Sequence, residues 1–213
     1  MKKHVFPLLL IAITILIWVI ALPNLPAKLP IHWNFSGEVD RYSGKAEAML
    51  LMVGIMVLIY GLFVAVPRID PKRDNYKYFS KSYGIIINSV LTLLAVVNIL
   101  IVLAGLGYDI PIVSFVNYIL GAIFIVLGNF MQQVRMNYFI GIRTPWTLSS
   151  ETVWKKTHRV AGKVFFVSGV LLILAAFLPA GWKPAVTLTI VIICGGLPLA
   201  YSYWLYKKEI SKL

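Results

Sequence analysis

Six long apolar tracts alternate with short polar segments along the chain, and none of the tracts contains Asp, Glu, Lys, Arg or His. A helix of about 20 apolar residues crosses a hydrocarbon core about 30 Å thick, and each tract is long enough for such a helix. The pattern therefore predicts an all-α, polytopic membrane protein. Its six transmembrane helices are expected over residues 5–22, 48–66, 82–108, 110–134, 164–182 and 184–206.

Composition supports a multi-pass protein of the cell membrane. Hydrophobic residues make up 60% of the chain and charged residues only 13%, against about a quarter charged in an ordinary soluble domain. The first tract also resembles a signal peptide, because Lys2 and Lys3 precede it. However, Pro23 and Pro26 stand where a cleavage site with small residues belongs. We therefore expect a retained first helix.

The distribution of basic residues predicts the orientation. With the N-terminus inside, only four of the 20 Lys and Arg residues lie outside, and the other sixteen lie in cytoplasmic segments. The four are Lys28, Arg41, Lys45 and Lys183. This asymmetry follows the positive-inside rule and places both termini in the cytoplasm. The net charge of +12 then indicates contact with anionic membrane lipid, and no direct binding of nucleic acid.

The chain is expected to form a single integral membrane domain over residues 1–213, built from two modules. Residues 1–66 form an N-terminal two-span module with an external loop at 23–47, and residues 82–213 form a four-span module with a cytoplasmic loop at 132–163. The prolines of the external loop favour two short extended segments lying on the bundle. Trp33, Phe35 and Tyr42 are expected at the level of the lipid headgroups.

The cytoplasmic loop predicts an amphipathic helix before the fifth span. Pro145 requires the fourth helix to end before it, Ser149 and Ser150 are N-cap candidates, and Glu151 suits the first turn of a helix. Apolar positions then recur at helical spacing opposite three basic residues, which favours a helix at the membrane interface that bends into the fifth span. The apolar positions are Val153, Trp154, Thr157, Val160, Ala161 and Val164, and the basic ones Lys155, Lys156 and Arg159.

The residues that carry chemistry argue against an enzyme. His4 and His158 lie inside and His32 outside, so they cannot share a metal, and we expect neither a metal site nor a cofactor. Motifs of the HExxH and P-loop types are absent. A pairing of His158 with Ser149 or Ser150 is interpreted as accidental. The polar residues in the spans are expected to form interhelical hydrogen bonds or, alternatively, a neutral binding pocket; they are Asn88, Ser89, Thr92, Asn98, Asn117 and Asn129.

Two loop contacts are expected on chemical grounds. His32 is predicted to bond Asp40 and fix the external loop over Trp33, although contact with an external ligand is the alternative. In the cytoplasmic loop Glu151 is the only acidic residue, so an ion pair with Arg143 or Arg159 is expected. The alternative for Arg143 is contact with a partner protein.

These two loops carry a family resemblance. The stretch NYFIGIRTPWTLSSETVWKKTHRVAG, residues 137–162, resembles the signature of the SdpI family of membrane immunity proteins. The segment LPAKLPIHWNFSGEVDRYSGK, residues 25–45, resembles the domain of unknown function that often precedes this signature. The external motif residues are Pro30, His32, Trp33, Asn34, Gly37 and Asp40. The cytoplasmic ones are Asn137, Gly141, Arg143, Thr144, Pro145, Trp146, Thr147, Glu151, Trp154, His158 and Arg159.

The resemblance implies immunity to a secreted antimicrobial peptide toxin that reaches the outer side of the membrane. It also implies signalling by recruitment of a transcriptional repressor to the cytoplasmic face. The alternative function is a membrane enzyme or a small-solute transporter with its site in the cytoplasmic loop. The lack of charge inside the spans argues against that alternative, because ion-coupled transport needs ionisable residues at membrane depth.

Overall fold

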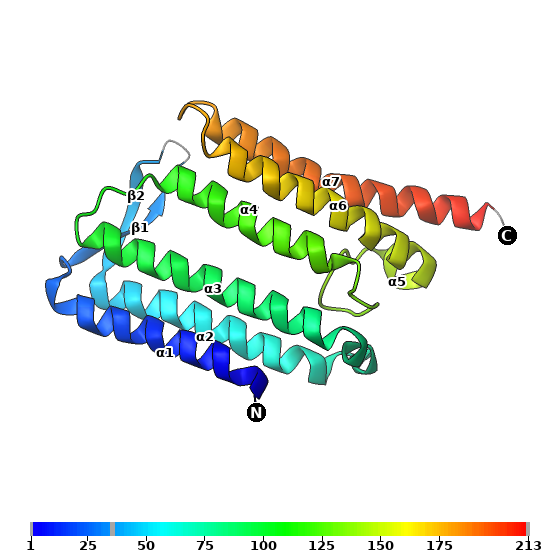
Figure 1. Cartoon of the computed structure of the whole chain (residues 1–213), viewed down its shortest axis with the longest axis horizontal. Helices are drawn as coiled ribbons and strands as arrows, with labels where there is room; N and C mark the ends of the chain where they lie inside the picture. Colours follow the sequence, from blue (N-terminus) through cyan, green and yellow to red (C-terminus); the bar gives the residue numbers. More distant parts are fainter. Residues whose placement is uncertain (1, 35–36, 212–213) are drawn as a thin grey trace.

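The computed structural model describes residues 2–34 and 37–211 and shows a helical bundle with one small β-hairpin (Figure 1). Six helical segments are long and apolar enough to cross a membrane, which confirms the predicted six-span protein. The long helices are α1 (Lys2–Ala21), α2 (Lys45–Ile69), α3 (Ser80–Gly105), α4 (Ile112–Met131), α6 (Glu151–Ala175) and α7 (Lys183–Ile210). The short elements are η1 (Leu22–Asn24), β1 (Lys28–Trp33), β2 (Val39–Gly44), η2 (Arg73–Phe79) and α5 (Pro145–Ser149).

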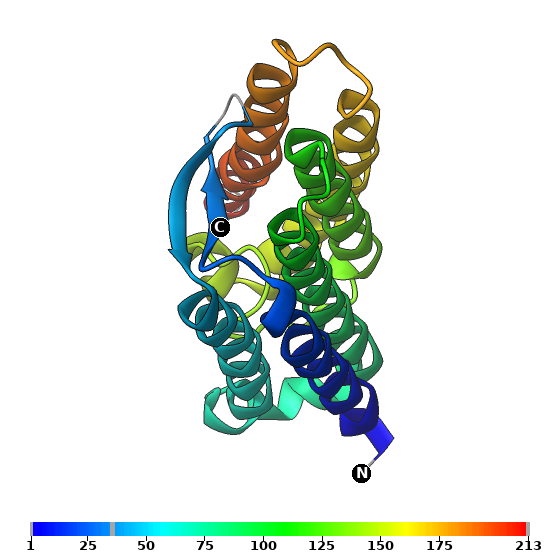
Figure 2. The same ribbon diagram turned by 90° about the vertical axis from the view of Figure 1, so that its left-hand side faces the viewer.

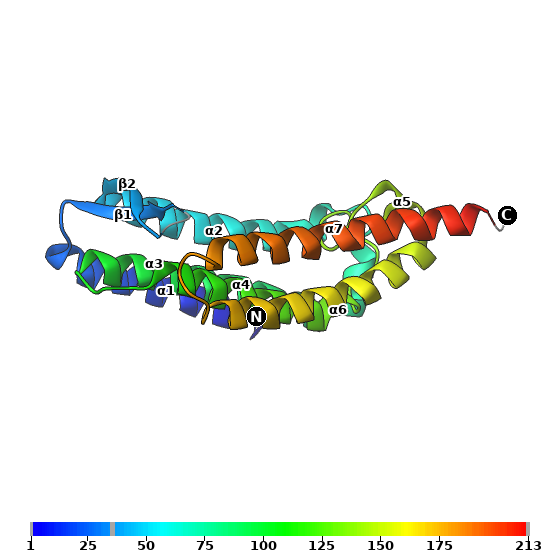
Figure 3. The ribbon, with the colours of Figure 1, turned by 90° about the horizontal axis from the view of Figure 1, so that it is seen from above.

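The helices lie in two layers. Seen from above, α1, α3, α4 and α6 form one layer, and α2 and α7 lie over them in the other (Figure 3). The hairpin lies at one end of the bundle, which we call the hairpin end. The loops that connect α2 with α3 and α4 with α6 lie at the opposite end, which we call the basic end (Figure 1). That the basic end faces the cytoplasm stays a prediction.

A bond between two helices holds the N-terminal half together. Trp18 of α1 is fully buried, and its indole Nε1 donates to Oδ1 of Asn98 in α3 over 2.8 Å. In hydrocarbon such a side-chain pair satisfies two polar groups that have no water to bond. Leu25 and Leu29, which follow α1, are buried in the same cluster and join the first strand to the bundle.

The external loop is an antiparallel hairpin that lies across the helix ends (Figure 2). Pro30 pairs with Tyr42 and His32 with Arg41. The ammonium group of Lys45 bonds the carbonyls of Leu22 and Leu25 at 2.9 and 3.0 Å, which closes the base of the hairpin onto the end of α1. The two extended segments predicted from the prolines are therefore present, whereas Phe35 lies outside the described residues.

Four glycines allow α4 and α6 to approach closely. A Cβ on Gly121 would stand 2.7 Å from the carbonyl oxygen of Gly169, and one on Gly128 would stand 2.7 Å from that of Gly162. The glycines recur every seven residues in both helices, and the helices run antiparallel, so the same register brings both pairs together. Small residues that admit close backbone contact are a common basis of helix packing in membranes.

The fifth span begins earlier than predicted. Helix α6 is continuous from Glu151 to Ala175, so the amphipathic segment forms its first turns rather than a separate element. The predicted division into faces is present there, with Val153, Trp154 and Thr157 buried and Lys155 and Lys156 exposed. That these turns lie along the membrane interface stays a prediction.

Candidate functional site at the basic end

The basic end is built from two loops that are far apart in the sequence. The segment between α2 and α3 meets the segment between α4 and α6, and both pack on the first turns of α6. Eleven motif residues were predicted here, and five of them, Asn137, Thr144, Thr147, Trp154 and His158, are buried parts of this framework.

Asn137 is the centre of the second loop. It is fully buried. Its Oδ1 accepts from the backbone N–H groups of Phe139 and Ile140 at 2.9 and 2.6 Å, and its Nδ2 donates to the carbonyls of Arg135 and Ile140, both at 2.9 Å. The amide thereby uses both ends to fold the backbone around itself, as an Asx turn does. Its role in the structure is to set the shape of the loop.

Asp70 joins the two loops, a role that no local sequence pattern indicates. It is 2% exposed. Its Oδ2 accepts from the Tyr76 hydroxyl at 2.9 Å and from the backbone N–H of Tyr138 at 3.0 Å, and its Oδ1 accepts from the N–H of Lys72 at 2.7 Å. Hydrogen bonds to an ionised acceptor are the stronger kind. A carboxylate after α2 therefore fixes the start of the second loop.

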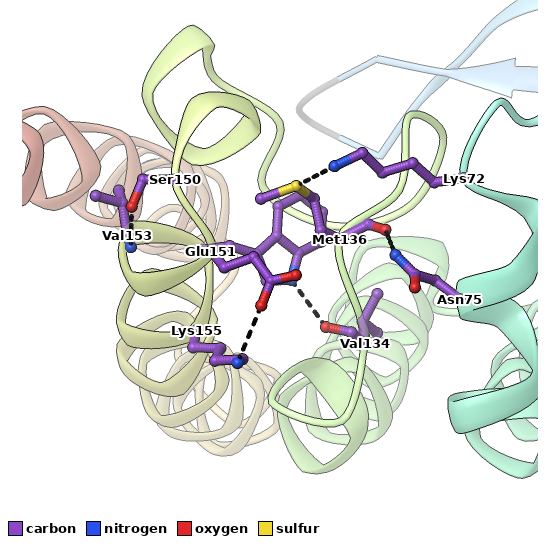
Figure 4. Close-up of polar contacts among 9 residues, drawn as sticks. Lys72, Asn75, Val134, Met136, Ser150, Glu151, Val153 and Lys155 are labelled. Atoms are coloured by element: carbon purple, nitrogen blue, oxygen red, sulfur yellow. Dashed lines mark hydrogen bonds and ion pairs between the residues drawn. The ribbon is translucent and has the colours of Figure 1, made fainter.

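Asn75, one turn further along the first loop, adds a second link, because its side chain donates to the carbonyl of Met136 at 2.6 Å (Figure 4). The Lys72 ammonium group points to the sulfur of the same methionine (Figure 4). The two loops are thus held at several points.

His158 is a buried structural residue. Its Nε2 accepts from the backbone N–H of Ile142 at 3.0 Å, and its Nδ1 lies 2.8 Å from the carbonyl oxygen of Trp154. Because Nε2 must be unprotonated to accept, the proton lies on Nδ1 and the ring is neutral. The ring also stacks on Trp154 with centroids 4.0 Å apart.

Gly141 passes directly over this ring. It has a φ of +108°, and a Cβ there would collide with the imidazole at Nε2. A residue with a side chain is therefore excluded both by the backbone conformation and by the available space. Gly141 and His158 form one contact between the loop and α6.

Thr144 and Thr147 build the short helix α5. Thr144 is the N-cap, its side chain accepts from the N–H of Thr147, and Pro145 occupies the first turn. The Thr144 hydroxyl also lies 3.2 Å from that of Ser202 in α7. Trp146 packs on Tyr203 of α7 with centroids 4.9 Å apart. The loop is thus connected to the last span by two adjacent contacts.

Replacing Thr144 with Ala is expected to lower the free energy of unfolding by about 1 kcal/mol, the usual effect of losing an N-cap. Thr144→Ser keeps the hydroxyl and should stay close to the wild type. The measurement is the melting temperature of the detergent-solubilised protein. Equal melting temperatures for the Ala and Ser variants would contradict this role of the cap.

The predicted ion pair of Glu151 with Arg143 or Arg159 is wrong. Glu151 instead pairs with Lys155, one turn along the same helix, at 3.2 Å (Figure 4). The Arg143 guanidinium donates to the carbonyl oxygen of Tyr138 at 2.6 Å. Four residues apart on a helix is the favourable spacing for a Glu–Lys pair. Both Arg143 and Arg159 are exposed.

The start of α6 follows the prediction. Ser150 is the N-cap, and its side chain accepts from the N–H of Val153 at 3.2 Å (Figure 4). Ser149 instead bonds the carbonyl of Trp146. Trp154 is 2% exposed, and its indole donates to the carbonyl of Val134 at 2.9 Å.

The motif predicted to be external lies at the hairpin end, separate from the motif at the basic end. The predicted contact between His32 and Asp40 is present at 2.5 Å, although both side chains are about half exposed. Trp33 packs against the buried cluster beneath the hairpin. Asn34 accepts from the N–H of Glu38 at 3.0 Å, and Gly37 has a φ of +85°, so these two residues form the turn between the strands.

Five of the six polar residues of the spans fall into two groups, and the sixth, Asn129, lines a separate cleft beside α6. Asn98 bonds Trp18, and Asn117 accepts from the Thr187 hydroxyl of α7 at 2.7 Å, so both form the expected interhelical bonds. Asn88, Ser89 and Thr92 instead line a groove of about 610 Å³ between α3 and α4, together with Phe115 and Tyr118. Thr92 is exposed in this groove, and the remaining lining is aliphatic.

Two kinds of catalytic site were considered for the basic end, a metal centre and a serine paired with His158. Within residues 2–34 and 37–211, no three His, Cys, Asp or Glu side chains are grouped so that they could hold a metal ion. Both ring nitrogens of His158 bond the backbone, which leaves no base for Ser149 or Ser150. A cleft of about 280 Å³ lies beside the framework, lined by Asn75, Tyr78, Arg135, Met136, Glu151, Trp154 and Lys155.

Comparison with known proteins confirms the family resemblance. Residues 133–202 match the SdpI/YfhL protein family. Residues 9–57 match DUF1648, a domain of unknown function. The immunity protein SdpI of Bacillus subtilis (strain 168) is 29% identical over 208 residues, which cover 98% of each chain. The chain is therefore a multi-pass membrane homologue of a bacterial immunity protein. No solved structure matches it.

Proposed function

We propose that this protein protects the cell that carries it from a secreted peptide toxin that reaches the outer face of the membrane. The observation that carries the proposal is the relationship to the immunity protein SdpI, which extends over 98% of both chains and so includes both loops and all six spans. The absence of charged residues from the six apolar tracts of the sequence supports a shield or sensor rather than an ion-coupled pump.

The groove between α3 and α4 supports a site for an amphipathic peptide. Asn88, Ser89 and Thr92 make no side-chain hydrogen bond to any residue that the structure describes. Hydroxyl and amide groups that face hydrocarbon without a partner are unfavourable. A toxin helix that inserts its polar side chains into the groove would supply these partners and cover the aliphatic walls with its apolar side chains.

The test is survival of a toxin-sensitive host that expresses the chain, with the peptide toxin countered by the SdpI protein as the probe. The wild type is expected to survive a dose that kills cells with an empty vector. Asn88→Leu/Thr92→Leu should abolish protection while leaving the melting temperature unchanged or higher, because both polar groups are removed from a lipid-facing surface. Thr189→Leu, which changes an exposed threonine of α7, is the matched control and should still protect.

Death of the cells that express the wild type at the normal level in the membrane would contradict immunity to this toxin. Survival of the groove variant would contradict the position of the site but not the function. Uptake or hydrolysis of a small solute by the purified protein would favour the alternative of a transporter or an enzyme.

We infer that the basic end also signals to a soluble repressor. The support is the pattern of exposure: Asn137, Thr144, Thr147 and His158 are buried and shape the loop, while Arg143 lies on its surface. The contacts of Thr144 and Trp146 with α7 give a route from the spans to this surface. Arg143→Ala should leave toxin protection intact and abolish recruitment of a fluorescent repressor to the membrane. Unchanged recruitment would contradict this inference.

A further inference from the structure

Two clefts on the basic end join into one surface. The first, of about 390 Å³, is lined by Tyr78, Gln132, Gln133, Arg135, Lys155 and Arg159. The second, of about 420 Å³, is lined by Gly128, Asn129, Gln132, Arg159, Gly162, Lys163, Phe166 and Val167. Gln132 and Arg159 line both, so the second cleft continues the first from the loop along α4 and α6.

The upper part of this surface is strongly basic. Lys155, Arg159 and Lys163 recur every four residues on one face of α6, and Arg135 comes from the loop opposite them. No acidic side chain lines either cleft among the described residues. Glu151, which lies in the neighbouring cleft, pairs with Lys155 at 3.2 Å and offsets one of the charges. The remaining cations attract an anion.

The lower part is lined by glycine and apolar side chains together with the uncharged Asn129. Beside the close crossing of α4 and α6 at Gly128 and Gly162, the second cleft forms a trough in which Phe166 and Val167 are 41% and 56% exposed. From Arg159 to Val167 the helix rises roughly 12 Å at about 1.5 Å per residue. That rise is close to half of a hydrocarbon core about 30 Å thick. The surface thus runs from headgroup level through most of the depth of one leaflet.

We propose that this surface binds one anionic phospholipid of the leaflet at the basic end. Its phosphate is held between Arg135 and Arg159, the Gln132 amide lies between headgroup and chain, and an acyl chain follows the trough over Gly128 and Gly162. A soluble anion would use only the basic part. The continuation of the cleft down the lipid-facing side of the bundle assigns the ligand to the membrane. Basic pockets between transmembrane helices commonly hold such headgroups.

The test uses the full chain in detergent, incubated with equal amounts of phosphatidylglycerol and phosphatidylcholine that have identical acyl chains. Native mass spectrometry counts the lipid that each protein molecule retains. The wild type should retain phosphatidylglycerol in preference to phosphatidylcholine. Arg135→Gln/Arg159→Gln should lower this preference about 25-fold, because each basic residue near anionic lipid contributes roughly five-fold. Lys207→Gln/Lys208→Gln removes the same charge at the end of α7 and should leave the preference near that of the wild type.

A second pair of variants tests the trough without changing the charge. Val167→Trp fills it and should lower retention of phosphatidylglycerol, whereas Val170→Trp, at a residue of the same helix that lines neither cleft, should not. Retention of both lipids equally by the wild type, or equal losses in the two arginine and lysine double variants, would overturn the proposal. Displacement of the lipid by millimolar glycerol phosphate would also overturn it, because it would show a site for a soluble anion.

Discussion

Replacing Asp70 with Ala is expected to lower the free energy of unfolding by about 3 kcal/mol or more, since it removes the acceptor of three hydrogen bonds at a buried site. Two of the donors, the N–H groups of Lys72 and Tyr138, belong to different loops. Without the carboxylate each is left without this partner, and one of the links between the loops is lost. Asp70→Asn should also destabilise the protein, because an amide offers one acceptor oxygen in place of two.

The chain contains a built-in probe for this measurement. Cys194 is the only cysteine of the sequence and is 1% exposed in α7, so a thiol-reactive fluorophore reports unfolding as it labels this residue. The expected decrease in melting temperature of Asp70→Ala is about 6–12 °C at 2–4 °C per kcal/mol for a chain of this size.

Asp74→Ala is the matched control for Asp70. Asp74 is exposed on η2, a few residues further along the same loop, so its removal changes the same charge without breaking the framework. Its melting temperature should stay within about 2 °C of the wild type, as surface substitutions usually do. A decrease as large as that of Asp70→Ala would show that net charge, and not the buried contacts, determines stability here.

The spans and their caps could be predicted because they depend on local chemistry. An uninterrupted apolar tract has few alternatives to a membrane helix, and Ser150 caps α6 through its own neighbouring backbone. The hairpin followed from its prolines in the same way. Each of these features is decided within a few residues of the chain.

The framework of the basic end could not be predicted, because its contacts join distant segments and often use the backbone. The hydroxyl of Tyr76 lies 3.3 Å from Oδ1 of Asn137, 61 residues away, and no local pattern indicates that pair. Arg143 donates to a backbone carbonyl oxygen. Every residue has such a carbonyl, so the sequence does not indicate which one is the acceptor. The prediction considered only acidic side chains as partners of Arg143 and therefore wrongly named Glu151. Asp70 resembled an ordinary residue of a charged connector.

The glycines between α4 and α6 were missed for a different reason. The sequence does show them, since Gly121 and Gly128, and likewise Gly162 and Gly169, are seven residues apart. The shorter GxxxG spacing is the familiar signal of helix association, and it is absent here. Only the antiparallel pairing of α4 and α6 shows that Gly121 lies against Gly169 and Gly128 against Gly162.

Replacing Gly128 with Ala is therefore expected to separate α4 from α6. The new Cβ would stand 2.5 Å from the backbone nitrogen of Phe166 and 2.7 Å from the carbonyl oxygen of Gly162. These are backbone atoms, which cannot turn away as the end of a flexible side chain does, so the helices must move apart. The expected loss is about 1–3 kcal/mol of unfolding free energy, the usual effect of overpacking. The Cys194 assay used for Asp70 measures it.

Gly84→Ala in α3 and Gly61→Ala in α2 are the matched controls, because a Cβ at either glycine meets no atom within 4 Å. Alanine is favoured over glycine inside a helix by about 1 kcal/mol, so these two variants should melt at or above the temperature of the wild type. The same chemical change is thus expected to have opposite signs at the two kinds of position. A stabilising Gly128→Ala would mean that α4 and α6 do not touch at this glycine, and the trough proposed to hold an acyl chain would lose its structural basis.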